Sequence, residues 1–151
     1  MRTLTRAAIT LLALSTFGTV TVSVALADQD EADTCVRSKV WEAYPEGWAV
    51  RTITKSSLAE TEHRIYLLTL YAGNEYKFLG CGDTTLTNVD LVLYDADGRM
   101  LVQDQTEDRQ PEVSFRPTAT DTFYLAVHAA KLAEGTEVGR KASVSTAVTY
   151  R

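Results

Sequence analysis

The sequence has few of the residues on which hydrolytic and metal chemistry usually depend. Only two cysteines and two histidines occur in 151 residues, and they form neither a C-x-x-C nor an H-x-x-x-H pair. Structural zinc sites normally use such short pairs, so a zinc centre is not favoured. The chain also lacks the G-x-S-x-G elbow of a serine hydrolase and the D-x-D-x-D-G loop of an EF-hand. We therefore predict that the protein is not an enzyme.

Basic charge and long apolar runs are also scarce. The chain has 15 Lys and Arg against 20 Asp and Glu, a formal net charge of −5. This balance argues against a nucleic-acid partner, because phosphate binding requires a basic surface. The one apolar segment, residues 7–24, is diluted by threonine and serine. A membrane anchor, the alternative to a cleaved segment, would need about 20 predominantly apolar residues.

The start of the chain has the pattern of an export signal. Arg2 and Arg6 precede the apolar segment, and Ala25-Leu26-Ala27 follows it as a small-x-small cleavage site. We predict a signal peptide over residues 1–27 and a periplasmic or secreted protein without a membrane contact after cleavage. Removal of residues 1–27 from the 151-residue chain leaves 124 residues, which is enough for one domain.

The two cysteines, Cys35 and Cys81, both lie in the predicted exported part. An oxidising compartment favours their pairing, so we predict a Cys35–Cys81 disulfide. The alternative is a zinc site that combines both cysteines with His63 and His128, but the spacing of these residues does not favour it.

The exported part divides at about residue 47. Residues 28–33 form a polar lead-in to this first part, residues 28–47. A short helix is predicted to follow, starting at Asp33 or Thr34 and ended by Pro45 and Gly47. Residues 48–151 contain short alternating runs separated by turn residues, which is typical of an antiparallel β-sandwich. The predicted strands lie near 48–54, 63–71, 75–81, 88–94, 99–104, 111–116, 122–128 and 142–150.

The clearest strand runs from Asn88 and stops at an acidic turn, Asp95-Ala-Asp97-Gly98. Leu91 and Leu93 would share its buried face. The carboxylates of four aspartates around this strand could bind calcium, a hard cation that prefers oxygen ligands. These candidate ligands are Asp90, Asp95, Asp97 and Asp104. In the alternative, the aspartates only cap backbone amides in turns.

Trp41, Tyr44 and Trp48 gather around the end of the predicted helix. Exposed aromatic side chains can stack on sugars or contact a protein partner, so these three are candidate ligand-binding residues. The alternative is packing between the helix and the sheet.

Several segments together resemble the bacterial pre-peptidase C-terminal domain. They are Tyr76-Lys-Phe78, Asp90 to Gly98, Asp104, Val113 to Pro117 and Thr122 to Val127. The likeness lies in the order and spacing of these motifs over roughly residues 60 to 150. It implies a jelly-roll-like sandwich that usually follows a secreted hydrolase, helps the hydrolase to reach its substrate, and binds calcium in clostridial collagen-binding relatives.

This chain departs from that pattern because it carries no catalytic domain, and the helix and cysteine pair are not general family features. We therefore predict a stand-alone, non-catalytic binding module for an extracellular protein or polysaccharide, with calcium as a possible structural ion. The alternative is an accessory or inhibitory partner that acts in trans on a secreted peptidase.

Overall fold

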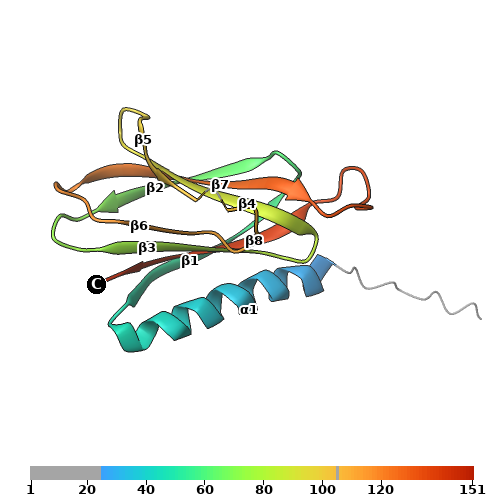
Figure 1. The fold of residues 1–151 in the computed structure, drawn as a ribbon, viewed down its shortest axis with the longest axis horizontal. Coiled ribbons are helices and arrows are strands. Elements are labelled where there is room, and N and C mark those ends of the chain that lie inside the picture. Colours follow the sequence, from blue (N-terminus) through green and yellow to red (C-terminus); the bar gives the residue numbers. More distant parts are fainter. Residues whose placement is uncertain (1–24, 105) are drawn as a thin grey trace, which may run out of the picture.

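The predicted β-sandwich is present as eight strands in two sheets, with one helix packed outside them (Figure 1). The structure is a computed structural model that describes residues 25–151 except residue 105, with side chains described from residue 31. Its elements are α1 (Ala25–Ala43), the 3-10 turn η1 (Tyr44–Glu46), β1 (Ala49–Leu58), β2 (His63–Leu70), β3 (Tyr76–Gly82), β4 (Leu86–Tyr94), β5 (Met100–Gln103), β6 (Glu112–Phe115), β7 (Asp121–Leu132) and β8 (Ala142–Tyr150).

The strand order is that of a jelly roll. One sheet has the order β1-β8-β3-β6 and the other β2-β7-β4-β5. The four strands of the first half of the chain therefore lie beside those of the second half in reverse sequence: β1 beside β8, β2 beside β7, β3 beside β6 and β4 beside β5. Every pair is antiparallel. The jelly-roll-like fold that the sequence predicts is confirmed.

Strand β8 is buried along residues 142–149, whereas β4 and β7 alternate between buried and partly exposed positions. The inward-facing Val144 and Val148 belong to the main core between the sheets. The outward-facing Ala147 packs instead with Val36 of α1 in a second, smaller cluster. Strand β8 is thus buried on both faces because α1 covers the outer side of its sheet (Figure 1).

Helix α1 begins earlier than the sequence predicts. We expected a start at Asp33 or Thr34, but the described helix already includes Ala25, and Ala32 within the predicted lead-in is fully buried. The helical segment ends as predicted: α1 stops at Ala43, Pro45 lies in η1, and Gly47 ends η1 with a left-handed φ of 88°. The predicted signal peptide lies outside the described residues except for residues 25–27, so its cleavage stays a prediction.

All eight predicted strands are present, but three are longer than predicted, among them β4, which begins at Leu86 rather than at 88. Strand β1 continues to Leu58 rather than ending at 54, and β7 continues to Leu132 rather than ending at 128. The extension of β7 follows from pairing, because Leu132 still lies opposite Leu86 of β4. Within residues 25–151, apart from residue 105, no helix is long and apolar enough to span a bilayer.

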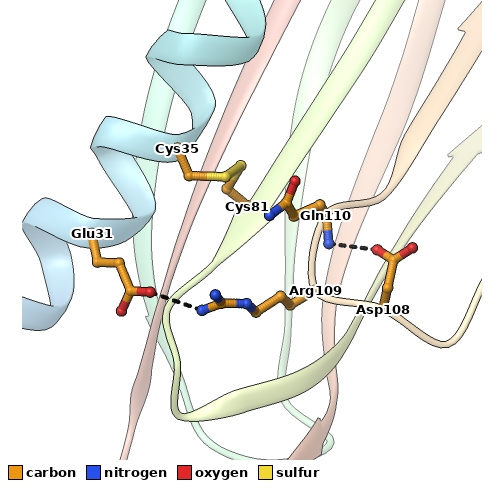
Figure 2. The surroundings of a disulfide bond; sticks show 6 residues. All are labelled: Glu31, Cys35, Cys81, Asp108, Arg109 and Gln110. Atoms are coloured by element: carbon orange, nitrogen blue, oxygen red, sulfur yellow. Dashed lines mark hydrogen bonds and ion pairs between the residues drawn. A yellow bond between two sulfur atoms is a disulfide. The ribbon is translucent and has the colours of Figure 1, made fainter.

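The predicted disulfide is confirmed: Cys35 of α1 is bonded to Cys81 of β3, with a Cα–Cα distance of 6.0 Å (Figure 2). A bond that closes 46 sequence steps stabilises a fold by about 4 kcal/mol in the chain-entropy account. It fastens the middle of the helix to the sheet that the helix covers.

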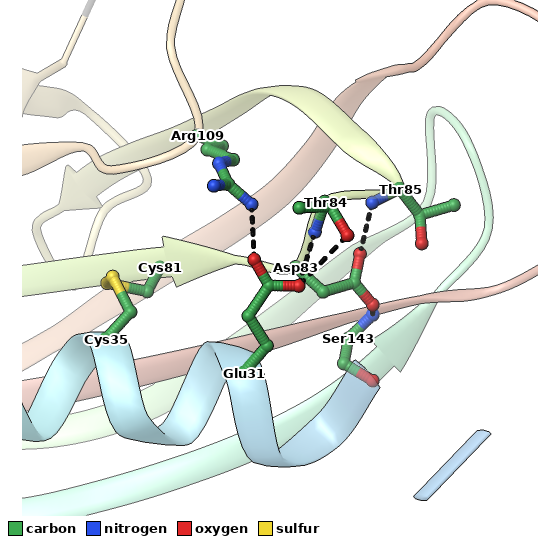
Figure 3. Close-up of polar contacts among 8 residues, drawn as sticks. All are labelled: Glu31, Cys35, Cys81, Asp83, Thr84, Thr85, Arg109 and Ser143. Carbon is green, nitrogen blue, oxygen red and sulfur yellow. Dashed lines mark hydrogen bonds and ion pairs between the residues drawn. A yellow bond between two sulfur atoms is a disulfide. The ribbon is translucent and has the colours of Figure 1, made fainter. Parts of the chain in front are cut away.

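A polar network fastens the start of the same helix (Figure 3). Glu31 accepts hydrogen bonds from the backbone and hydroxyl of Thr84 at 3.0 Å each, and it pairs with Arg109 at 2.9 Å. Beside it, the fully buried Asp83 accepts hydrogen bonds from the backbone N–H groups of Thr85 at 2.9 Å and Ser143 at 2.7 Å. The turn between β3 and β4 is therefore held from both sides.

Candidate functional site

The outer face of the β2-β7-β4-β5 sheet is apolar and open to solvent. Leu67 is 66% exposed and Ile65 is 54% exposed, both on the edge strand β2. We call this surface the open face and define it by seven side chains. They are Ile65, Leu67, Val92, Tyr94, Met100, Tyr124 and Ala126. The corresponding face of the other sheet is covered by α1, so the two outer faces of the sandwich differ in kind.

Strand register arranges the open face in rows. In the first row, Leu67 lies opposite Tyr124, which lies opposite Tyr94, and Tyr94 lies opposite Met100. The second row consists of Ile65, Ala126 and Val92. Side chains that lie opposite one another on the same face of a sheet are in contact range, so these rows form one continuous apolar surface.

A third row of this face is polar, and polar side chains also lie beyond the first row, where Thr69 is opposite Thr122, and in the second row, where Gln103 is opposite Val92. His63 lies opposite His128, and His128 lies opposite Asp90, with His128 Nδ1 3.2 Å from Asp90 Oδ2. The sequence placed His128 at a strand end, which is wrong, because β7 continues beyond it. The neighbouring row of Ile65, Ala126 and Val92, with Gln103 opposite Val92, gives this His–Asp pair no nucleophile to activate.

A pocket of about 250 Å³ opens at the end of the sandwich where β1 begins and β2 ends. We call it the tyrosine pocket. Its lining residues are Arg51, Tyr71, Asn74, Tyr76 and Tyr150. The register of β1 against β8 shifts between Val50 and Thr52, so Arg51 is the extra residue of a β-bulge. Bulges re-aim side chains, and here the guanidinium of Arg51 lies 5.8 Å from the centre of the Tyr71 ring.

The four candidate calcium ligands do not form one group, although Asp95 and Asp97 both pair with Arg99. Asp90 contacts His128 on the open face, whereas Asp95 caps the β4–β5 turn by accepting hydrogen bonds from the backbone of Asp97 and Arg99. Asp104 accepts hydrogen bonds from the backbone of Thr106 and Glu112 on the other side of β5. In the described part of the chain no group of three or more His, Cys, Asp or Glu could hold a metal ion.

The surroundings of two of these aspartates explain their charge state. The Arg99 backbone lowers the pKa of the Asp95 carboxyl group by donating a hydrogen bond to it. The Arg99 guanidinium lowers this pKa further, and together they outweigh desolvation, which raises it. For Asp104, desolvation raises the pKa, but hydrogen bonds from Thr106 and the Glu112 backbone outweigh it and the net pKa is lowered. Both carboxylates are kept ionised by protein donors.

The three candidate aromatic residues fall into two environments. Trp41 and Tyr44 are 76% and 65% exposed, and their rings are stacked with centres 6.0 Å apart. Trp48 is only 3% exposed, and the cationic groups of Lys77 and Arg151 lie over its ring at 5.0 Å and 4.5 Å. Trp48 therefore serves packing in this structure, whereas ligand binding by Trp41 and Tyr44 stays a prediction.

Sequence reasoning missed the tyrosine pocket and the open face. Arg51, Tyr76 and Tyr150 are far apart along the chain, and the pairing of β8 with both β1 and β3 brings them together. Tyr71 joins them through the hydrogen bond of its N–H to the Tyr76 hydroxyl. The sequence did contain a signal for the open face. Ile65 and Leu67 lie on one face of β2 and Leu68 and Leu70 on the other, so both faces of this strand carry apolar residues. A strand that is apolar on both faces indicates that something covers the second face.

The fold defines the class to which the chain is similar, a jelly-roll sandwich of the pre-peptidase C-terminal type. The chain is similar to the pre-peptidase C-terminal domain of a collagenase from Bacillus anthracis, with a TM-score of 0.50 and 16% identity over 66% of this chain and 89% of that domain. The resemblance stated from the sequence is thus confirmed at the level of the fold.

A second solved structure is equally similar. It is PliG of Aeromonas hydrophila, a periplasmic lysozyme inhibitor of g-type lysozyme, with a TM-score of 0.51 and 14% identity over 70% of this chain and 90% of that chain. No protein-family model and no curated protein matches the sequence. The likeness to both neighbours is one of fold.

Proposed function

We propose that this protein is a non-catalytic binding module that docks through its open face on a protein partner outside the cytoplasm. The observation that carries the proposal is the pair of apolar rows on the β2-β7-β4-β5 sheet, with Leu67 and Ile65 more than half exposed. Apolar side chains that lie side by side on a domain surface, several of them exposed, commonly mark an interaction site.

The composition of the open face favours a protein over a polysaccharide at this position. Its defining side chains are aliphatic, aromatic or methionine, and lysine and glutamate do not occur among them. Aromatic residues and methionine are enriched in the centre of protein interfaces, whereas lysine and glutamate are depleted there. Aliphatic side chains such as Leu67 gain most by burial against another apolar surface. The His128–Asp90 pair would form part of a polar rim.

Separate observations support a location outside the cytoplasm and a non-catalytic role. The Cys35–Cys81 bond fits an oxidising compartment, and the basic and apolar start of the chain supports export. The two solved neighbours are a domain appended to a collagenase and an inhibitor, which supports a role as a partner rather than as an enzyme.

Photo-cross-linking in cells that produce the protein tests the docking proposal. A photoreactive amino acid is placed at position 67 on the open face, and in a control protein at position 138, which is fully exposed in a distant loop. We expect one discrete adduct with a second protein from position 67 and none from position 138. Equal adducts from both positions, no adduct, or an adduct only with a second copy of this chain would contradict the proposal.

A second candidate function is inhibition of a secreted hydrolase in trans, which the fold-level likeness to the lysozyme inhibitor favours. The direct test adds the purified protein to g-type lysozyme and follows lysis of bacterial cells. A decrease in rate that is lost in Leu67→Asp would support inhibition through the open face. An unchanged rate would exclude g-type lysozyme as the target and leave the cross-linking experiment to identify another.

A further inference from the structure

The tyrosine pocket lies apart from the open face and has a different chemistry. From its lining we infer that it binds the carboxylate of an acidic sugar, a hexuronate unit of an extracellular polysaccharide. This site does not depend on the proposed protein partner, because the side chains that form it belong to the β1 start, the β2–β3 connection and the end of β8.

Arg51 is the positive group of the pocket, and its position is fixed before any ligand binds. Nη1 of Arg51 donates a hydrogen bond to the Thr69 carbonyl, and the guanidinium lies over the Tyr71 ring. A guanidinium carries five N–H donors, so this single bond leaves donors free. No carboxylate of the described residues lies within ion-pair distance of Arg51, in contrast to Arg37, Arg99 and Arg109.

Glu75, the acidic residue between Asn74 and Tyr76 in the sequence, is already engaged. It pairs with Arg151 at 3.0 Å and with Arg116 at 3.3 Å. The Arg151 hydrogen bond outweighs desolvation and, with both arginine charges, lowers the pKa of Glu75. Glu75 is therefore shared by Arg151 and Arg116 and does not pair with Arg51, which is left to bind an anion from outside.

The floor of the pocket offers a second donor. Tyr76 is only 1% exposed, and its hydroxyl oxygen accepts hydrogen bonds from the Tyr71 backbone at 2.9 Å and from Nδ2 of Asn74 at 3.3 Å. With both accepting positions occupied, the hydroxyl can add a bond only by donating its hydrogen. Arg51 and Tyr76 both require an acceptor, and a carboxylate is a group that only accepts.

The size and walls of the pocket select a ring rather than a short side chain. A carboxylate on one or two methylene groups, as in an acidic peptide, would leave most of about 250 Å³ empty. Tyr71 and Tyr150 are 52% and 37% exposed, so their rings are available for contact with the apolar edge of a sugar. A few polar groups in an otherwise apolar hollow are the usual composition of a small-ligand site.

Calorimetry on the mature protein tests the inference with three probes of matched length: a β-1,4-linked oligoglucuronate, the corresponding neutral glucose oligomer, and a glutamate-containing peptide. We expect measurable binding of the oligoglucuronate alone, weakened by added salt. Arg51→Gln should reduce its affinity about tenfold or more, the ratio for loss of a charge-assisted hydrogen bond. The control Arg64→Gln, at an exposed arginine near the opposite end of β2, should leave affinity unchanged.

Each alternative result overturns the inference. Equal binding of the neutral oligomer would show that the carboxylate is not recognised, and tighter binding of the peptide would make this a peptide site. No binding of the oligoglucuronate, or equal binding by Arg51→Gln, would show that Arg51 is a surface residue only. An unchanged melting temperature of Arg51→Gln excludes misfolding as the cause of lost affinity. Leu67→Asp should bind the oligoglucuronate normally, so failure of the docking proposal would not affect this result.

Discussion

Glu31 and Arg109 are 78 residues apart in the sequence, yet Oε1 of Glu31 lies 2.9 Å from Nη1 of Arg109. Arg109 is itself fixed, because its backbone carbonyl accepts a hydrogen bond of 2.7 Å from the N–H of Gly82 in β3. The helix that covers one sheet is therefore attached to the segment that enters β6, as well as to β3 through the disulfide (Figure 2).

The first prediction concerns acid sensitivity. Desolvation raises the pKa of Glu31, but hydrogen bonds from Thr84 and Arg109 outweigh it and lower the net pKa. A lowered carboxyl pKa contributes stability that is complete above the ordinary glutamate pKa of about 4.3 and is lost as the pH falls through the lowered value. We expect the melting temperature of Glu31→Gln to fall by a few degrees at pH 7, for a partly exposed interaction worth about 1 kcal/mol or less. The difference from the unchanged protein should shrink below pH 4, and a constant difference at all pH values would contradict this account.

The second prediction concerns the disulfide. Replacement of both Cys35 and Cys81 by serine should destabilise the protein by about 4 kcal/mol and lower the melting temperature on the order of 15 °C. Reduction of the unmodified protein should have the same effect and none on the double variant, as measured by circular dichroism. Detection of two reactive thiols in the non-reduced protein would show that the bond does not form.

The third prediction compares a buried aspartate, Asp83, with an exposed one, Asp97. Asp83→Ala leaves the backbone N–H groups of Thr85 and Ser143 without their partner in a buried turn, which should cost about 2–4 kcal/mol. Asp97→Ala is the control, because that side chain is 77% exposed and its pair with Arg99 is worth little. Urea denaturation measures both. Similar costs for the two variants would contradict the role assigned to Asp83.

The fourth prediction concerns calcium. Asp90, Asp95 and Asp104 each serve a separate partner in the protein, so the melting temperature should be the same in chelator and in several millimolar calcium. A site that binds only the folded state at about 100 times its Kd would add about 2.7 kcal/mol, which a melting curve resolves. A calcium-dependent rise that disappears in the double variant Asp95→Asn, Asp97→Asn would restore the calcium hypothesis.

Local patterns were sufficient to predict the strands and their order of occurrence. Alternation at Leu91 and Leu93 fixed the buried face of β4, and both side chains are fully buried. The acidic turn after it was placed correctly, with Gly98 at a left-handed φ of 79°. These features depend on neighbours within one strand or one turn, so a single sequence contains them.

The features that sequence reasoning missed depend on contacts between distant segments. The start of α1 is held by Thr84 and Arg109, and its polar residues alone gave no indication of that contact. The aspartates near one strand were expected to converge, but successive turns direct Asp95 and Asp104 to different backbone donors. The bulge at Arg51 likewise has no local signature, because it exists only in the register of β1 against β8.

The position of β8 has a consequence for the order in which the protein can fold. This strand is the last of the eight along the chain, yet it lies between β1 and β3 and under α1. When the chain emerges with its N-terminal end first, Cys35 can pair with Cys81 before β8, the neighbour of β1, is available. Closure of that sheet waits for residues 142–150, so in a partly emerged chain β1 stays separate from β3 and its partner β6.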